Sequence, residues 1–233
     1  VDTVTGELLT DRVKMYTPKG GEPEAVVETV LEVIEKVGGL DDGVPVGVCF
    51  PAVVKHGRTM SAANVSKRWI GLEAEALFEQ SLGRNITFIN DADAAGYAEL
   101  HYGAAKGQQG LVILTTLGTG IGSAFLYDGV LIPNTELGHL QMHGDSAEVR
   151  ASYGAKERGD LSWAKWAERL QEYYAYLEAL FSPDLFVVGG GVSKNSDDFL
   201  PLLNITTPLV PAVHRNNSGI IGAAALAAIG FHA

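Results

Sequence analysis

The sequence has a single cysteine, Cys49, so no disulfide can form within its 233 residues. This cysteine lies in the apolar run Val44–Phe50, which predicts a buried thiol in a reducing compartment. No run of about 18 or more apolar residues is present, which argues against a transmembrane helix. The first residues also lack the charged and then apolar pattern of a signal peptide. We therefore expect a cytoplasmic protein without membrane contacts.

Positive charge is scarce, with 17 Lys and Arg against 28 Asp and Glu and a net charge of -11. Broad, sequence-independent binding of nucleic acid requires many phosphate-neutralising cations, so we expect no nucleic-acid partner. An anionic ligand must instead meet a local site lined by cations or backbone amides. The sequence contains 46% hydrophobic residues and 28 glycines, which is typical of a globular α/β protein.

Several familiar catalytic motifs are absent. There is no GxxxxGK[ST] run and no GxGxxG, which argues against a P-loop and against a dinucleotide-binding fingerprint. HExxH and GxSxG are missing as well, so neither a zinc protease nor a hydrolase of the nucleophile-elbow type is indicated.

Apolar periodicity and turn residues predict an alternation of helices and strands. Val1–Leu9 resembles the tail of a hairpin, and Asp128-Gly129 predicts a tight hairpin turn. Helices are expected at residues 24–37, from about 91 to 102, 161–181 and 218–229; strands are expected at 44–50, 86–89, 111–117, 123–127, 130–132 and 185–188.

Asp91 is the strongest single candidate for catalysis. It follows the predicted strand 86–89 and the polar Asn90, at the carboxyl end of a strand, where open α/β sheets bind ligands. The alternative is that Asp91 simply caps the helix that follows, and one residue can have both roles.

Two predicted strands end in glycine turns, at Gly118–Gly122 and Gly189–Gly191. Such turns can present backbone N–H groups to anionic oxygens, although a glycine turn taken alone is more often only a tight turn. Glu136 and His139 form a further polar pair separated by a glycine. Groups at this spacing can bind vicinal hydroxyls, as sugar recognition requires, whereas a lone histidine more often has a structural role.

These motifs together resemble the ROK family of sugar kinases and repressors, and the similarity spans most of the chain. The motifs are Phe50-Pro51-Ala52-Val53, Asn90-Asp91-Ala92, Leu117-Gly118-Thr119-Gly120-Ile121-Gly122, Glu136-Leu137-Gly138-His139 and Gly189-Gly190-Gly191-Val192-Ser193. Further motifs resemble the bacterial branch that phosphorylates glucose, and in some members mannose, with polyphosphate or ATP. These are Ala62-Ala63-Asn64-Val65, Trp69-Ile70-Gly71 and Phe181-Ser182-Pro183-Asp184-Leu185.

The resemblance implies an actin-like ATPase (ribonuclease H-like) kinase fold with two α/β lobes and a central cleft. The small lobe is expected at residues 1–101, completed by the C-terminal helix at about 218–233, and the large lobe at 102–217. Residues 1–233 lack the DxGGT-type turn with which family members open and which cradles the phosphates. The small lobe is therefore expected to lack its first strand and turn within this sequence.

By motif, Asp91 is expected to be the general base for phosphoryl transfer. The residues expected to hold the hexose are Asn64, Asn90, Glu136, His139 and Glu148. Those expected to bind phosphate or nucleotide are Thr116, Gly118, Thr119, Gly120, Gly189, Gly190 and Gly191.

The expected ligands are glucose, mannose, polyphosphate and ATP, with Mg²⁺ bound to the phosphate donor; a homodimer is among the expected assemblies. No zinc is expected, because residues 141–150 contain none of the cysteines of the zinc loop found in many family members. A non-catalytic sugar-binding regulator of the same family is the main alternative, but residues 1–21 do not match a helix-turn-helix. A different acyl or phosphoryl transferase on the same fold is a third interpretation.

A polyanionic donor needs a local group of cations on so acidic a chain. Lys55, His56, Arg58, Lys67 and Arg68 form one candidate group, and Lys194, His214 and Arg215 form another. The alternative for each is an ordinary solvated surface charge.

Overall fold

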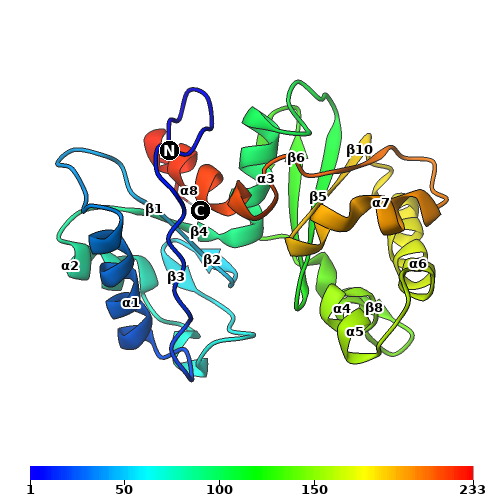
Figure 1. The fold of residues 1–233 in the computed structure, drawn as a ribbon, viewed down its shortest axis with the longest axis horizontal. Coiled ribbons are helices and arrows are strands. Elements are labelled where there is room, and N and C mark those ends of the chain that lie inside the picture. Colours follow the sequence, from blue (N-terminus) through cyan, green and yellow to red (C-terminus); the bar gives the residue numbers. More distant parts are fainter. Residues whose placement is uncertain (233) are drawn as a thin grey trace. The chain divides into compact units, whose positions relative to one another are not determined.

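The computed structural model describes residues 1–232, which form two compact units (Figure 1). Unit 1 comprises Val1–Ala94 and Gly219–Ala233, and unit 2 comprises Ala95–Ser218. The chain passes from one unit to the other within helix α3 (Asp91–Tyr102) and at the start of helix α8 (Ser218–Ala228). The lobe boundaries predicted from the sequence, after residue 101 and before residue 218, stay a prediction.

Unit 1 is built on two parallel strands, β1 (Gly47–Phe50) and β4 (Thr87–Asn90). Its helices α1 (Pro23–Lys36) and α2 (Ala74–Leu82) cover one face, and α8 lies against the other (Figure 1). The remaining elements of unit 1 are β2 (Val54–Lys55), β3 (Arg58–Thr59) and η1 (Lys67–Trp69).

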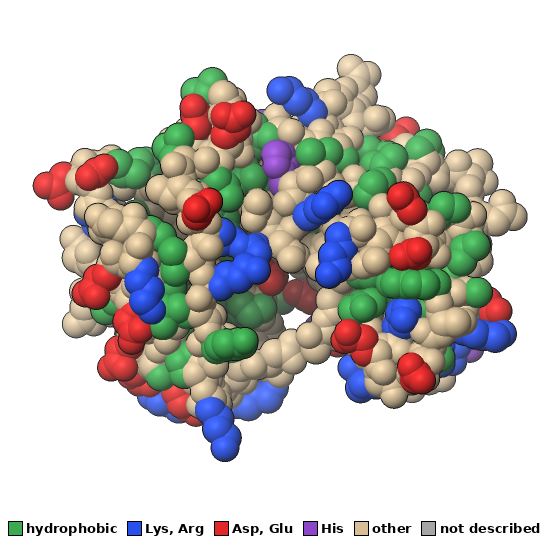
Figure 2. Space-filling view, in the orientation of Figure 1, with side chains coloured by type: hydrophobic (Ala, Val, Ile, Leu, Met, Phe, Trp, Pro, Cys, Tyr) green, Lys and Arg blue, Asp and Glu red, His purple; other side chains and the backbone are tan. Residues whose placement is uncertain are grey.

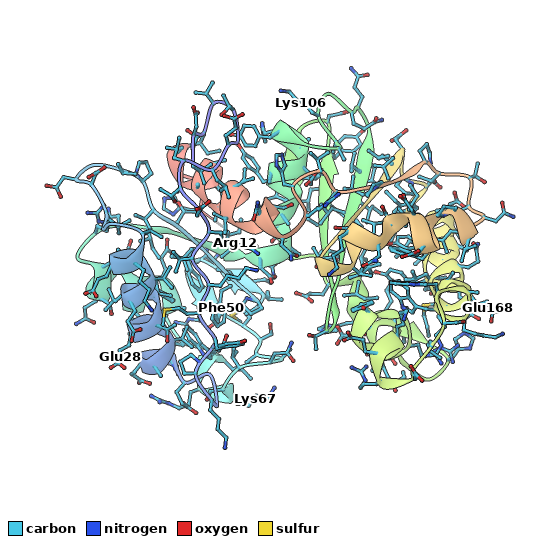
Figure 3. All side chains as sticks on the ribbon, viewed as in Figure 1. Arg12, Glu28, Phe50, Lys67, Lys106 and Glu168 are labelled. Carbon is cyan, nitrogen blue, oxygen red and sulfur yellow. The ribbon has the colours of Figure 1, made fainter. Side chains whose placement is uncertain are left out.

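An aromatic cluster fills the space between the β1–β4 pair and the helices α1 and α2. Phe50 contacts Trp69 at a ring-centroid distance of 4.3 Å and Phe88 at 5.8 Å, and Figure 3 shows Phe50 inside this unit. Phe78 completes the cluster from α2, at 5.6 Å from Phe88. Because side chains alternate along a strand, Gly47 and Cys49 face the opposite side of β1, toward α8.

Unit 2 contains a five-stranded sheet in the order β11-β10-β5-β6-β7. Strand β10 is parallel to β5 and β11, whereas β5, β6 and β7 form an antiparallel meander. The strands are β5 (Leu111–Leu117), β6 (Ile121–Tyr127), β7 (Val130–Ile132), β10 (Leu185–Gly189) and β11 (Leu209–Pro211).

Helices cover both faces of this sheet. The long helix α6 (Trp163–Phe181) packs Trp166, Leu170 and Leu177 against Ile113 and neighbouring apolar side chains, while Glu168 lies on its exposed face (Figure 3). On the other face, Gly96 of α3 lies against Ala124 of β6. The shorter elements are η2 (Leu137–His139), β8 (Gln141–Met142), β9 (Asp145–Ser146), α4 (Ala147–Ala151), α5 (Tyr153–Arg158), η3 (Gly191–Asn195), α7 (Ser196–Phe199), η4 (Leu200–Leu202) and η5 (Arg215–Asn217).

The predicted elements are confirmed with small shifts at their ends, apart from two corrections. Val1–Leu9 forms turns and no strand. The strand predicted from Val44 begins only at Gly47, because Asp42-Gly43 and Pro45 keep the preceding residues irregular. None of the helices formed by residues 1–232 combines the length and apolar character needed to cross a bilayer.

Two glycines of α8 provide a matched test of its packing. A Cβ atom on Gly222 would lie 1.7 Å from the carbonyl oxygen of Ala94, whereas one on Gly219 would meet Cys49 Sγ at an ordinary 3.5 Å. We expect Gly222→Ala to lower the free energy of unfolding by about 2 kcal/mol or more, because backbone must shift to admit the methyl group. Gly219→Ala should stay within about 0.5 kcal/mol of the parent. Urea denaturation measures both, and equal losses would contradict this packing.

Candidate functional site

The first candidate group lies where β4 runs into α3 in unit 1. The Asn90 Oδ1 atom accepts hydrogen bonds from the N–H groups of Ala92, at 2.8 Å, and Asp93, at 3.1 Å. Asn90 Nδ2 donates to the carbonyl oxygen of Ala52, at 3.0 Å. Asn90 therefore caps the helix, and Asp91 is its first residue; the catalytic role of Asp91 stays a prediction.

Asp91 is the first residue of α3 and is exposed, although the next four residues are buried. The protein around its carboxylate displaces water and so raises the pKa of Asp91 above the ordinary value. Hydrogen bonds from the N–H of Ala92 and from its own N–H oppose this shift. A carboxylate that ligands can reach, but that holds its proton more tightly than usual, is suited to accepting a proton from a substrate.

Cys49 lies on the neighbouring strand, and the structure shows it partly buried. Burial raises the pKa of its thiol to about 12, and the negative charge of Asp91 adds to this effect. The thiol is therefore protonated at neutral pH, which leaves Asp91 as the chemically active group here.

Asn64, the third predicted site residue of unit 1, is exposed in the irregular segment before η1. This segment is held by its neighbours: Ser66 N–H donates to the carbonyl oxygen of Gly21, at 3.3 Å, and Lys67 Nζ donates to that of Ala62. The Asn64 side chain is thus presented to solvent by an anchored segment.

The first glycine turn lies in unit 2 and closes the β5–β6 hairpin, in which Leu117 pairs with Ile121. Gly120 lies against Glu148, because a Cβ on Gly120 would lie 2.4 Å from Glu148 Oε2 and would displace that carboxylate. The same carboxylate oxygen accepts a hydrogen bond from the Ile121 N–H, at 3.1 Å. Thr119 at the tip is exposed, and Thr116 at the end of β5 is partly buried.

Glu136, His139 and Glu148 form one cluster beside this turn. His139 Nδ1 lies 3.8 Å from Glu136 Oε2, and His139 Nε2 lies 3.8 Å from Glu148 Oε1. The imidazole is more than half exposed, at 57%, while the two carboxylates are about 30% exposed. Gly138 makes the arrangement possible, because a Cβ there would lie 2.3 Å from the carbonyl oxygen of Ile121. The cluster offers acceptors and donors close enough together to bind adjacent hydroxyl groups.

Ser123 is a positioning residue that the sequence analysis missed. Its buried hydroxyl donates to the carbonyl oxygen of Thr135, at 2.7 Å, and accepts from the Leu137 N–H, at 3.0 Å. These bonds hold both neighbours of Glu136. The available signal was a hydroxyl on a strand otherwise rich in apolar residues, since a buried hydroxyl needs hydrogen-bond partners.

The second glycine turn follows β10 and packs against the end of β5. Gly190 has a φ of +83°, and a Cβ there would lie 2.6 Å from the carbonyl oxygen of Leu117. Only glycine fits this position without strain. The Cβ position of Gly191 lies 3.7 Å from Asn216 Oδ1, which places η5 beside the turn.

The two candidate groups of cations differ in their local pairing. In unit 1, Arg58 pairs with Glu73, and Arg68 pairs with Glu22, at 3.2 Å, and with Glu24. In unit 2, the exposed Lys194 and Arg215 have no ion pair among residues 1–232. Within each unit, acidic and basic side chains are interspersed over the face seen in Figure 2.

His214 differs from the other two members of the group in unit 2. Its Nε2 atom is buried and has no hydrogen-bond partner in the described part of the chain, so this nitrogen does not face solvent. Lys194 and Arg215 are therefore the cations of unit 2 best placed to meet an anion beside the second glycine turn.

The structure thus places the predicted residues in two groups, each described within its own unit. Asn64, Asn90 and Asp91 belong to unit 1, and the predicted glycines, threonines, Glu136, His139 and Glu148 belong to unit 2. No cluster of three or more His, Cys, Asp or Glu residues within positions 1–232 is arranged to hold a metal ion.

The fold and these motifs define the class of protein. The family model "ROK family" matches residues 3–157, and the chain belongs to that family. Its fold is the mixed α/β, actin-like fold of ROK sugar kinases.

Individual relatives give a narrower comparison than the family as a whole. The chain is 48% identical over 225 residues to a polyphosphate glucokinase from Mycobacterium tuberculosis (strain CDC 1551 / Oshkosh), covering 96% of this chain and 84% of that protein. The inorganic polyphosphate/ATP-glucomannokinase from Arthrobacter sp. strain KM is 49% identical, with a TM-score of 0.96 over 99% of this chain and 93% of that one. A ROK family glucokinase from Streptomyces griseus shares the fold, with a TM-score of 0.83 over 97% of this chain and 94% of that one, at 23% identity.

Proposed function

We propose that this chain transfers a phosphoryl group from polyphosphate or ATP to the 6-hydroxyl of glucose, and of mannose, with Asp91 as the general base. The activities for which relatives at 48% and 49% identity are named support the reaction class and the substrates. The observation that carries the chemistry is that Asp91 is an exposed residue directly after β4, and that lost hydration raises the pKa of its carboxyl group.

In the proposed reaction, the oxygen of the sugar hydroxyl attacks the terminal phosphorus of the donor. A new oxygen–phosphorus bond forms, the bond to the leaving phosphate oxygen breaks, and the hydroxyl proton passes to the Asp91 carboxylate. Asn90 holds Asp91 in place by capping α3. Asn64, Glu136, His139 and Glu148 are proposed to bind the sugar hydroxyls and align the reacting oxygen, which is a large part of the rate gain in phosphoryl transfer.

The backbone of the two glycine turns is proposed to face the donor phosphates. Turns without side chains allow N–H groups to approach phosphate oxygens closely. Mg²⁺ bound with the donor would neutralise part of its charge. Such an ion is usually held by substrate phosphates, water and one or two carboxylates, so it needs no dedicated protein cluster.

The proposed reaction is tested with purified protein, expressed together with any sequence that precedes Val1 in its gene. Glucose and mannose are each combined with ATP and with polyphosphate, and hexose phosphate is measured. We expect product from glucose with at least one donor. A protein that binds glucose but forms no hexose phosphate in any combination would instead be a sugar-binding regulator.

Asp91→Asn keeps the size of the side chain but removes the proton acceptor. We expect turnover to fall by about 10²-fold or more. Hexose affinity measured by calorimetry should change little. This result would show that the variant lacks the proton acceptor but still binds the sugar. A variant with near-parent turnover would exclude Asp91 as the base.

Glu136→Gln and His139→Ala are expected to weaken glucose binding, each by about tenfold, because a hydrogen bond to the sugar is lost or left unpaired. His143→Ala is the matched control, since His143 is also a half-exposed histidine beside a carboxylate, 2.9 Å from Glu172. Calorimetry with glucose measures all three variants. Unchanged affinity in both site variants would show that this cluster does not bind the sugar.

Lys194→Gln combined with Arg215→Gln is expected to raise the apparent KM for long polyphosphate more than that for ATP. Removing two cations that contact a polyanion should also make the loss of affinity with added salt less steep. The control combines Lys106→Gln with Lys165→Gln, which removes the same charge from exposed positions elsewhere in unit 2. Equal effects of the two double variants would mean that Lys194 and Arg215 are ordinary surface charges.

A further inference from the structure

Glu99 is a fully buried carboxylate on α3, with 0% of its surface exposed. None of the ion pairs within residues 1–232 includes it. A buried charge without a counter-ion is costly unless hydrogen bonds replace its lost hydration. Glu99 is not among the residues expected to touch the sugar or the donor, so its burial requires another explanation.

Four donors surround the Glu99 carboxylate. Oε2 accepts hydrogen bonds from the N–H groups of Ala104, at 2.9 Å, and Val213, at 3.0 Å. Oε1 accepts from the His214 N–H, at 2.9 Å, and from the Ser218 hydroxyl, at 3.0 Å. Three of these four donors belong to the segment 213–218, which connects β11 to α8. The carboxylate therefore fixes this segment at both of its ends.

Gly103 shows that the space around the carboxylate is tightly defined. A Cβ on Gly103 would lie 2.1 Å from Glu99 Oε2, so a larger residue would displace the carboxylate or the turn after α3. The Gly103 N–H also donates to the Glu99 carbonyl oxygen, at 3.2 Å. The position of the Glu99 carboxylate therefore depends on the glycine at position 103.

The segment held by Glu99 packs beside the second glycine turn. Ala212, just before it, donates its N–H to the carbonyl oxygen of Val188, at 2.9 Å, and its Cβ lies 3.7 Å from the Cβ position of Gly189. Asn216 approaches Gly191, with Oδ1 at 3.7 Å from the Cβ position. The turn and the segment therefore lie side by side.

The backbone of Arg215 adopts a conformation that this residue type does not favour. Its φ is +52°, in the left-handed region that residues other than glycine rarely adopt. Such a conformation persists when surrounding contacts enforce it. Such contacts lie on both sides of Arg215. Glu99 accepts a hydrogen bond from the His214 N–H before it. After it, the Ser218 hydroxyl lies 3.0 Å from Glu99 Oε1 and 2.9 Å from the Arg215 carbonyl oxygen.

We propose that Glu99 is a positioning residue for the phosphate donor, which holds residues 213–218 against Gly189–Gly191 and sets the place of Arg215. This inference rests on the proposed function, because it assigns the donor to the second glycine turn. Glu99 itself touches no reacting atom and acts through the segment that it binds.

Glu99→Gln is the sharpest test, because each carboxylate oxygen now serves two donors. A glutamine has one acceptor oxygen, so its NH₂ group must face at least one backbone N–H and push the segment away. We expect the apparent KM for ATP and for polyphosphate to rise by about tenfold or more. The KM for glucose should stay within about twofold of the parent, because none of the residues expected to hold the hexose belongs to this segment.

Ser218→Ala is the milder second variant, since it removes one of the four donors and leaves the carboxylate in place. Its rise in donor KM should be smaller than that of Glu99→Gln. Leu177→Ala controls for lost stability, because Leu177 is fully buried on α6 and belongs to neither residues 213–218 nor Gly189–Gly191. The variants are compared at conditions where each has lost the same free energy of unfolding. If Leu177→Ala then raises the KM for the phosphate donor as much as Ser218→Ala and Glu99→Gln do, the positioning role is wrong.

Hydrogen exchange provides a readout that does not depend on activity. In the parent, the amides of Val213 and His214 should be protected, and both Glu99→Gln and Ser218→Ala should speed their exchange selectively. Unchanged exchange there would overturn the proposal even in an active kinase. Selective exchange in a protein that transfers no phosphate would instead contradict the proposed function and leave Glu99 as the residue that positions the segment.

Discussion

The capping of α3 by Asn90 determines where the candidate base can lie. The Asn90 side chain accepts hydrogen bonds from the N–H groups of Ala92 and Asp93 at the start of the helix, and Asp91, the first helical residue, lies exposed beside this cap. Ala92, Asp93 and Ala94, which follow Asp91, are buried within unit 1, so the start of the helix is anchored there. One amide side chain thus links the end of β4, the start of α3 and the group proposed to take the proton.

A second constraint is the close approach of backbone segments in unit 2. Gly120, Gly138 and Gly190 each lie where a Cβ would come within 2.6 Å of another atom of the protein. These contacts bring the hairpin turn against Glu148, η2 against β6, and the second glycine turn against β5. Gly120 and Gly190, which suggested phosphate binding from the sequence, therefore also have a packing role, and the two roles are compatible.

Much of the fold could be predicted from local sequence. Strand 111–117 and the Asp128-Gly129 hairpin follow from apolar patterning and turn chemistry, which act over a few residues. Local sequence could not show that Arg58 and Arg68 pair with glutamates, or that Glu99 binds residues more than a hundred positions away. These contacts depend on how distant segments meet. The Asn90 cap was missed for a different reason, since Asn90 and Asp91 are both good capping residues and only geometry separates them.

The dependence of kcat/KM on pH tests the central claim about Asp91 most directly. A base must be deprotonated to work, and the pKa of Asp91 is raised, so activity should fall on acidification at a higher pH than an ordinary carboxylate would give. The account predicts that this acid limb is present in the parent and absent from the residual activity of Asp91→Asn. An acid limb with the same midpoint in both proteins would show that another group titrates, and would contradict the assignment of Asp91 as the base.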